Sequence, residues 1–194
     1  PLRKAEMTTT ATEPAAEKQH GAEEEPEIET SSVILLFTGL MLAMFMFSLN
    51  QTMLATALPT IVGDLNGVDQ MLWVSTAFML ASTIMMPIYG KLGDSFNRKK
   101  IFIFAICMFI LGSVVGFLAH NMAVLITARV IQGLGGGGLI ILSQALIAAV
   151  VPARKRGPYM GIMGANFAVT SVAGPLIGGW ITEGPGWRWT FALN

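Results

Sequence analysis

The chain has 194 residues, of which 53% are hydrophobic and only 12% are charged, whereas soluble domains carry about 25% charged residues. Its formal net charge is zero, which gives no reason to expect nucleic acid as a partner. The single cysteine excludes an internal disulfide, and the two isolated histidines offer no zinc-binding spacing. The composition therefore predicts a membrane protein.

Residues 1–30 differ from the rest of the chain, because they hold eight of the twelve acidic residues and show no apolar periodicity. Such a composition is typical of disorder, and the segment lacks the basic start and short apolar region of a signal peptide. We expect a disordered tail over 1–30 and a helical membrane domain over 31–194. Because an apolar segment is interrupted at Asn194, we interpret the chain as the N-terminal part of a longer protein.

Five apolar runs are long enough to cross a bilayer, which takes about 20 helical residues. A sixth run begins at Trp187 and stops at the end of the sequence. We therefore expect an all-α polytopic membrane protein with five complete transmembrane helices and the start of a sixth. The five runs cover residues 33–57, 71–89, 101–118, 122–149 and 159–181.

The connecting segments alternate in charge along the chain. Segments 90–100 and 152–157 are rich in Lys and Arg, whereas 59–70 and 182–186 contain acidic residues and no Lys or Arg. Cytoplasmic loops carry the excess of positive charge in membrane proteins. We expect both basic segments and the N-terminal tail to be cytoplasmic, in a multi-pass protein of the plasma membrane.

The segment LITARVIQGLGGGGL places Arg129, the one charged residue within these apolar runs, on a helix face shared with Gln132. Burying a guanidinium at membrane depth costs roughly 2.5–3.5 kcal/mol on insertion scales, so such residues usually serve a function. Arg129 would lie on a substrate or proton route, or it would clamp the helix bundle by bonding backbone carbonyls. The G-x-G-x-x-G pattern at Gly133 is not a nucleotide site, because it lies inside an apolar helix and follows no strand.

The segment GKLGDSFNRKK places an acid, Asp94, among cations. Gly90 permits a tight turn at the end of one span, and Asp94 can pair with Arg98 and Lys99. These residues could form a latch at the cytoplasmic side, or the cations could act only as topological anchors.

This segment resembles the signature of the major facilitator superfamily, G-x-L-a-D-r-x-G-R-[RK]. Gly90, Asp94, Arg98 and Lys99 match it, and Asn97, a residue type that tolerates a positive φ, replaces its second glycine. The Arg129 segment similarly resembles the family's helix 4 motif. The resemblance implies the N-terminal half of a major facilitator fold and a role for the arginine in proton transfer or its gating.

Two further segments resemble a narrower group. TSVAGPLIGGW is similar to the helix 5 motif of antiporters, and its glycines at i and i+4 also form a small face on which a neighbouring helix can pack. LNQTMLATALP resembles the helix 1 motif of the fourteen-helix drug:proton antiporters, in which Asn50 stands at the position of a carboxylate. The matching positions of the antiporter motif are Gly174, Pro175, Gly178 and Gly179.

These resemblances imply proton-coupled export of small, mostly apolar or cationic compounds by alternating access, with no cofactor and no enzymatic reaction. Arg129, Gln132 and Asn50 would lie along the proton or substrate route, and a carboxylate in later helices would titrate. The lipid bilayer, a small-molecule substrate, protons and the C-terminal half of the parent transporter would be the partners. The alternatives are an importer or uniporter of a nutrient on the same fold, and a truncated membrane partner that transports nothing.

Overall fold

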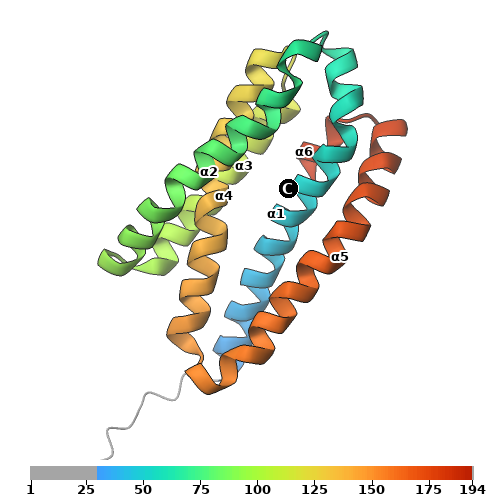
Figure 1. Cartoon of the computed structure of the whole chain (residues 1–194). Helices are drawn as coiled ribbons and strands as arrows, with labels where there is room; N and C mark the ends of the chain where they lie inside the picture. The colour runs from blue at the N-terminus through green and yellow to red at the C-terminus, as the bar shows by residue number, and fades with distance from the viewer. Residues whose placement is uncertain (1–29, 194) are drawn as a thin grey trace, which may run out of the picture.

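The computed structural model describes residues 30–193, so the expected tail lies outside the described residues except for Thr30. The described residues form long helices joined by short turns, as Figure 1 shows. The helices are α1 (Thr30–Asp64), α2 (Met71–Ser95), α3 (Arg98–Phe117), α4 (Met122–Val150), α5 (Arg156–Glu183) and the short α6 (Trp189–Ala192). Two 3₁₀ turns, Val68–Gln70 and Ala153–Lys155, precede α2 and α5.

Five of the helices within residues 30–193 are long and apolar enough to cross a membrane, which confirms the expected fold class. Successive long helices run in opposite directions (Figure 1). We call the end that carries segments 90–100 and 152–157 the basic end, and the end that carries Asp64, Asp69 and Glu183 the acidic end.

Two helices, α1 and α2, extend furthest beyond the bounds predicted from the sequence. α1 continues through Pro59 to Asp64, although proline lacks the N–H that would bond to the carbonyl of Ala55. The last turns of α1 bury Ile61 and Val62, and this apolar burial outweighs the lost hydrogen bond. α2 likewise continues through Gly90 to Ser95.

The predicted tight turn at Gly90 is therefore wrong, because this glycine lies inside a helix. The chain turns instead at Phe96 and Asn97, which have extended backbone conformations. Asn97 has φ −64° rather than a positive value, and its side-chain Oδ1 accepts a hydrogen bond from the backbone N–H of Lys99 at 3.0 Å. Asn97 thus acts as the N-cap of α3.

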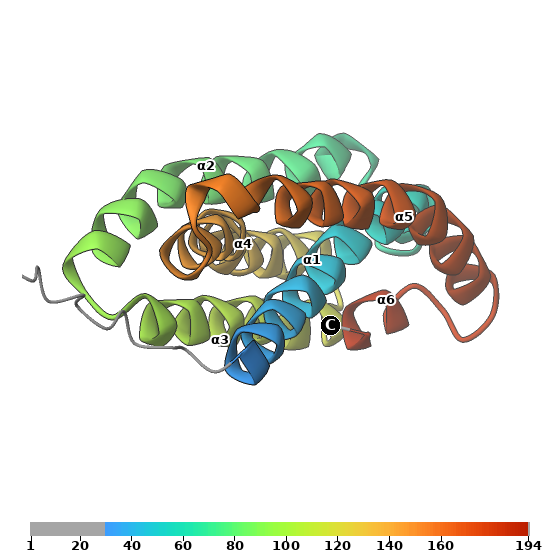
Figure 2. The same ribbon diagram turned by 90° about the horizontal axis from the view of Figure 1, so that it is seen from below.

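α4 is the central helix of the domain and lies between α2 and α3 (Figure 2). Its glycines bring the helix backbones together. A Cβ added to Gly133 would lie 2.6 Å from the carbonyl oxygen of Phe78 in α2, and one added to Gly135 would lie 2.6 Å from the backbone nitrogen of Phe109 in α3. The G-x-G-x-x-G pattern is therefore a packing surface.

α1 joins this group of three helices to α5. It packs along α5 and also contacts α4. Along both α1 and α4, buried polar residues separate two apolar clusters: Asn50 lies between Phe47 and Leu54, and Arg129 lies between Leu125 and Leu139. The fold thus encloses a thin polar layer between apolar clusters.

Candidate functional site

Arg129 is the centre of the polar layer and is only 2% exposed. Its Nη1 donates to the Oδ1 of Asn50 at 3.2 Å and to the Oε1 of Gln132 at 2.7 Å. Its Nη2 donates to the Oε1 of Gln51 at 2.7 Å, and its Nε donates to the carbonyl of Val74 at 3.3 Å. One guanidinium therefore links α4 to both α1 and α2.

The partners of Arg129 are neutral. Its Cζ lies 4.2 Å from the ring centroid of Phe78, whose face attracts a cation, and its hydrogen-bond acceptors are amide and carbonyl oxygens. Among residues 30–193 the single ion pair joins Arg98 to Asp94, far from this layer. The buried charge is consequently solvated by dipoles and not neutralised by an acid.

Gln132 extends the network to α3. It is fully buried, and its Nε2 donates to the hydroxyl of Ser113 at 2.8 Å. Within residues 30–193, three buried side-chain polar atoms have no hydrogen-bond partner: the Nδ2 of Asn50, the Oγ of Ser143 and the hydroxyl of Tyr89. Arg129 thus contacts both Gln132, with which it shares a helix face, and Asn50 of α1, whereas the hydroxyl of Ser143 stays outside the network.

α1 distributes its polar residues to two neighbours. Asn50 and Gln51 reach Arg129, whereas Ser48 and Thr52 face α5. The hydroxyls of Ser48 and Thr170 share a hydrogen bond of 2.5 Å, and Thr52 donates to the carbonyl of Thr170 at 3.2 Å. Successive residues point about 100° apart on a helix, which lets one short polar run serve two interfaces.

The antiporter-like motif lies on the same α1–α5 interface. A Cβ added to Gly174 would collide with the side chain of Thr52, and one added to Gly178 would lie 2.9 Å from the Cα of Met53. Gly179 has nothing within 4 Å of an added Cβ, and Pro175 lies inside α5 with an exposed side chain. Gly174 and Gly178 therefore let α1 approach α5 closely.

Of the predicted latch residues Gly90, Asp94, Arg98 and Lys99, Arg98 pairs with Asp94, but this pair is the lesser of its contacts. Arg98 donates through Nε to the carbonyl of Gly93 at 3.0 Å and through Nη1 to the carbonyl of Ala145 in α4 at 3.0 Å. Its pair with Asp94 is 3.2 Å long, and the Asp94 side chain is 76% exposed. Lys99 makes no ion pair within the described part of the chain. At the basic end, Arg98 thus connects α3 to α4 by bonding a backbone carbonyl of α4.

Several contacts were not foreseen from the sequence. Arg156 donates to the carbonyls of Ala148 and Val151 at the end of α4. At the acidic end, the indole of Trp187 donates to the Oδ2 of Asp64 at 2.9 Å. These partners are far apart in sequence or belong to backbone carbonyls, so no residue pattern identifies them.

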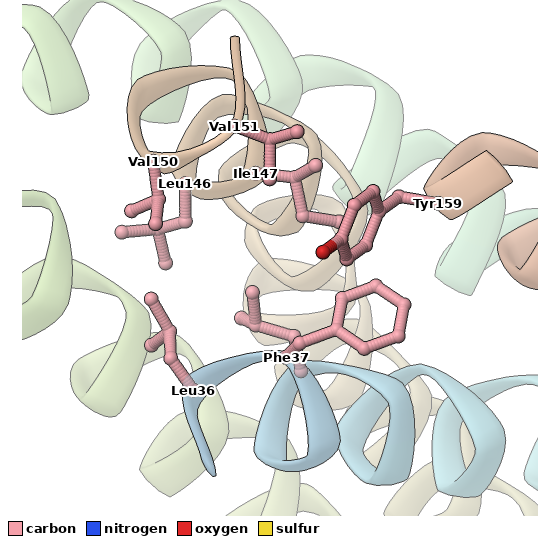
Figure 3. Close-up of a pocket in the computed structure, with 8 residues that line it drawn as sticks. Leu36, Phe37, Leu146, Ile147, Val150, Val151 and Tyr159 are labelled. Atoms are coloured by element: carbon pink, nitrogen blue, oxygen red, sulfur yellow. The ribbon is translucent and has the colours of Figure 1, made fainter. Parts of the chain in front are cut away.

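A small apolar pocket lies at the basic end, between the start of α1, the end of α4 and the start of α5 (Figure 3). The rings of Phe37 and Tyr159 meet edge to face there, with centroids 4.8 Å apart. Aliphatic side chains form most of the lining and no charged group enters it. This pocket is therefore part of the apolar packing where these three helix ends meet. Within residues 30–193, no group of His, Cys, Asp and Glu could hold a metal ion.

Comparison with known proteins gives a consistent result. The sequence model of the Major Facilitator Superfamily matches residues 40–194. "Multidrug transporter protein MdtP" of Bacillus subtilis is 39% identical over 168 residues, which cover 87% of this chain and 31% of that protein. "Efflux pump FUS6" of Gibberella moniliformis is 34% identical over 196 residues, covering 100% of this chain and 35% of that protein. The chain spans about a third of the length of these relatives.

Proposed function

The chain belongs to the major facilitator superfamily and is a multi-pass membrane protein, and from this premise we propose that it is the N-terminal part of a transporter that exports small drug-like compounds. The names of its relatives, a multidrug transporter and an efflux pump, support this direction of transport. The observation that carries the proposal is the buried Arg129, held by neutral groups of three helices. Such a charge is costly and typical of a transport route.

The packing of the domain suits alternating access, in which one half of a transporter rocks against the other around a site near the midplane. Close backbone contacts hold α4 against α2 and α3, so this group can move as one body. The polar layer lies where α1 joins that group. A compound that contacts this layer would therefore touch both parts of the domain.

We further propose proton coupling and membership of the fourteen-helix branch of drug:proton antiporters. The described spans contain no acid that could titrate at depth, because Asp64, Asp69, Asp94 and Glu183 all lie at helix ends or in turns. The proton carrier would be a carboxylate in the C-terminal half. Asn50→Ala should then change substrate affinity but leave the pH dependence of transport unchanged, as measured in vesicles with an imposed proton gradient.

The proposed orientation places the basic end in the cytoplasm and the protein in the plasma membrane. Ser95 and Asp69 are exposed and lie near opposite ends of α2. In a Cys107→Ala background, which removes the exposed native cysteine, Ser95→Cys should react with an impermeant maleimide only after the cells are opened. Asp69→Cys should react in intact cells. The reverse pattern would contradict the orientation.

Transport itself is tested with the full-length protein expressed in cells that lack their major efflux pumps. Export predicts lower steady-state accumulation of a fluorescent cationic dye, of a fluorescent anionic dye, or of both. A protonophore should restore the accumulation. Higher accumulation of a nutrient would favour an importer. Unchanged accumulation across a broad panel, with the protein present in the membrane, would favour a non-transporting partner.

A further inference from the structure

The polar layer contains more hydrogen-bond donors than acceptors. A guanidinium has five N–H groups, and the structure uses four of those of Arg129: one on Nε, two on Nη1 and one on Nη2. One Nη2 hydrogen is therefore left. Desolvated donors without acceptors are costly, so such groups usually have a partner in the functional state.

Asn50 adds to the surplus at the same place. Its Oδ1 is bonded to the guanidinium of Arg129, so its amide lies against this charge, but its Nδ2 is buried and has no partner. Rotating the amide by 180° would not remove the surplus, because it would turn the NH₂ group towards a cation. The two amide hydrogens of Asn50 and one guanidinium hydrogen of Arg129 are thus left without acceptors around a buried positive charge that no acid of the described residues pairs with.

Gln51 lies where a ligand could reach the guanidinium of Arg129. Among the side chains that accept from Arg129 it is the one that is only partly buried, whereas Asn50 and Gln132 are 2% and 0% exposed. Gln51 accepts from Nη2 of Arg129, which is the nitrogen whose second hydrogen has no acceptor. Moving its long side chain aside would present both Nη2 hydrogens to an incoming group.

We propose that Arg129, Asn50 and Gln51 form an anion-binding site that takes the carboxylate of a small amphiphilic compound. The carboxylate displaces the amide of Gln51, accepts from Nη2 of Arg129 and from Nδ2 of Asn50, and neutralises the buried charge. Charge-assisted hydrogen bonds of this kind are stronger and shorter than those to a neutral amide. Phe78, which stacks on the guanidinium, and the neighbouring apolar clusters suit the remainder of such a molecule.

This inference rests on the proposed function in one respect, namely that the bound compound is a transported substrate. It also alters the expectation of cationic substrates, because the described half places a positive charge at the site. Any cation would need an acid from the C-terminal half.

The experiment measures equilibrium binding of radiolabelled benzoate to the purified chain in detergent, with neutral benzamide and cationic benzylamine as matched probes. Benzoate should bind at least about tenfold more tightly than either probe, which corresponds to about 1.4 kcal/mol. Equal affinity for benzoate and benzamide would overturn the proposal.

Asn50→Asp is the decisive variant, since it keeps the side-chain shape but supplies the site with its own carboxylate. It should weaken benzoate binding at least about tenfold, whereas the same change at the exposed Asn66 should not. Gln51→Ala should strengthen binding, because it removes the group that benzoate must displace. Unaltered binding by folded Asn50→Asp, or weaker binding by Gln51→Ala, would contradict the assignment. Should Asn50→Asp fail to fold, the probe comparison and Gln51→Ala still decide.

A second source of the carboxylate is a side chain of the C-terminal half. Binding of benzoate by this chain but not by the full-length protein would assign the site to that side chain and overturn the ligand proposal. Binding by the full-length protein without any transport would keep the anion site and reject the proposed function. Transport without benzoate binding would keep the proposed function and reject the anion site.

Discussion

α4 meets its neighbours in two different ways. Against α2 and α3 it presents glycines, and an added Cβ would lie 2.5 Å from the carbonyl oxygen of Ser82 at Gly137 or 2.6 Å from the backbone of Phe109 at Gly135. Against α1 it presents the guanidinium of Arg129, which bonds the side chains of Asn50 and Gln51. The first interface is made mainly by backbone contact, although Arg129 and Gln132 also bond Val74 and Ser113 there, and the second is made mainly by long polar side chains.

This difference separates the fixed part of the domain from the adjustable part. Two backbones in contact can slide only by breaking dense packing, because interiors transmit strain. A hydrogen bond between long side chains can exchange partners through rotation about side-chain bonds. We therefore expect stability to depend most on the glycine surface of α4 and transport to depend most on Arg129.

The largest expected effect is that of Arg129→Lys on transport. An ammonium cannot bond at once the carbonyl of Val74 and the amides of Asn50 and Gln51, which a planar guanidinium reaches from three nitrogens. The initial rate of export by the full-length protein should fall roughly a hundredfold, or about 2.7 kcal/mol. Membrane insertion should be retained, as cell fractionation would show. If Arg129 is only a clamp, the variant should lose folded protein instead.

A smaller effect is expected when the glycine surface is filled. Gly137→Ala should lower the free energy of unfolding by about 2 kcal/mol, as overpacked sites do, because the carbonyl of Ser82 cannot move away alone. Thermal denaturation in detergent, followed by circular dichroism, measures the change. Gly161→Ala is the matched control, since nothing lies within 4 Å of its added Cβ. Equal melting temperatures of the two variants would remove the proposed distinction between the interfaces.

The α1–α5 interface should be intermediate in sensitivity. Gly178→Ala would bring a Cβ to 2.9 Å from the Cα of Met53, a milder overlap than that at Gly137. We expect a loss of about 1 kcal/mol in the free energy of unfolding, measured by the same melting experiment. Gly179→Ala, one residue along and free of contacts, should cost nothing. A larger loss for Gly178→Ala than for Gly137→Ala would reverse the expected order.

The smallest effect is expected for Asp94→Asn. Its pair with Arg98 is largely exposed, and such pairs contribute about 0–1 kcal/mol. The melting temperature should change little, and any change should disappear at high salt. Arg98→Ala should cost more, because it also frees the carbonyls of Gly93 and Ala145. A stronger effect of Asp94→Asn than of Arg98→Ala would show that the carboxylate has a further partner.

The sequence predicted the number of spans and the meeting of Arg129 with Gln132, because both follow from apolar length and helical spacing. It placed helix ends poorly, because proline and glycine are the weakest helix formers but Pro59 and Gly90 lie inside helices here. Gln51 was missed because it neighbours Asn50 and should point about 100° away. Its long side chain nevertheless reaches Arg129, and side-chain reach is not encoded in spacing.

The polar run of α1 also has a consequence for biosynthesis. The Asn50 partner, Arg129, follows 79 residues later, and the Ser48 partner, Thr170, follows 122 residues later. At roughly 5–20 residues per second of translation, these partners emerge about 4–16 and 6–24 seconds after α1. Newly made α1 must therefore wait with unsatisfied amides and hydroxyls, which favours its retention at the insertion machinery until α4 and α5 arrive.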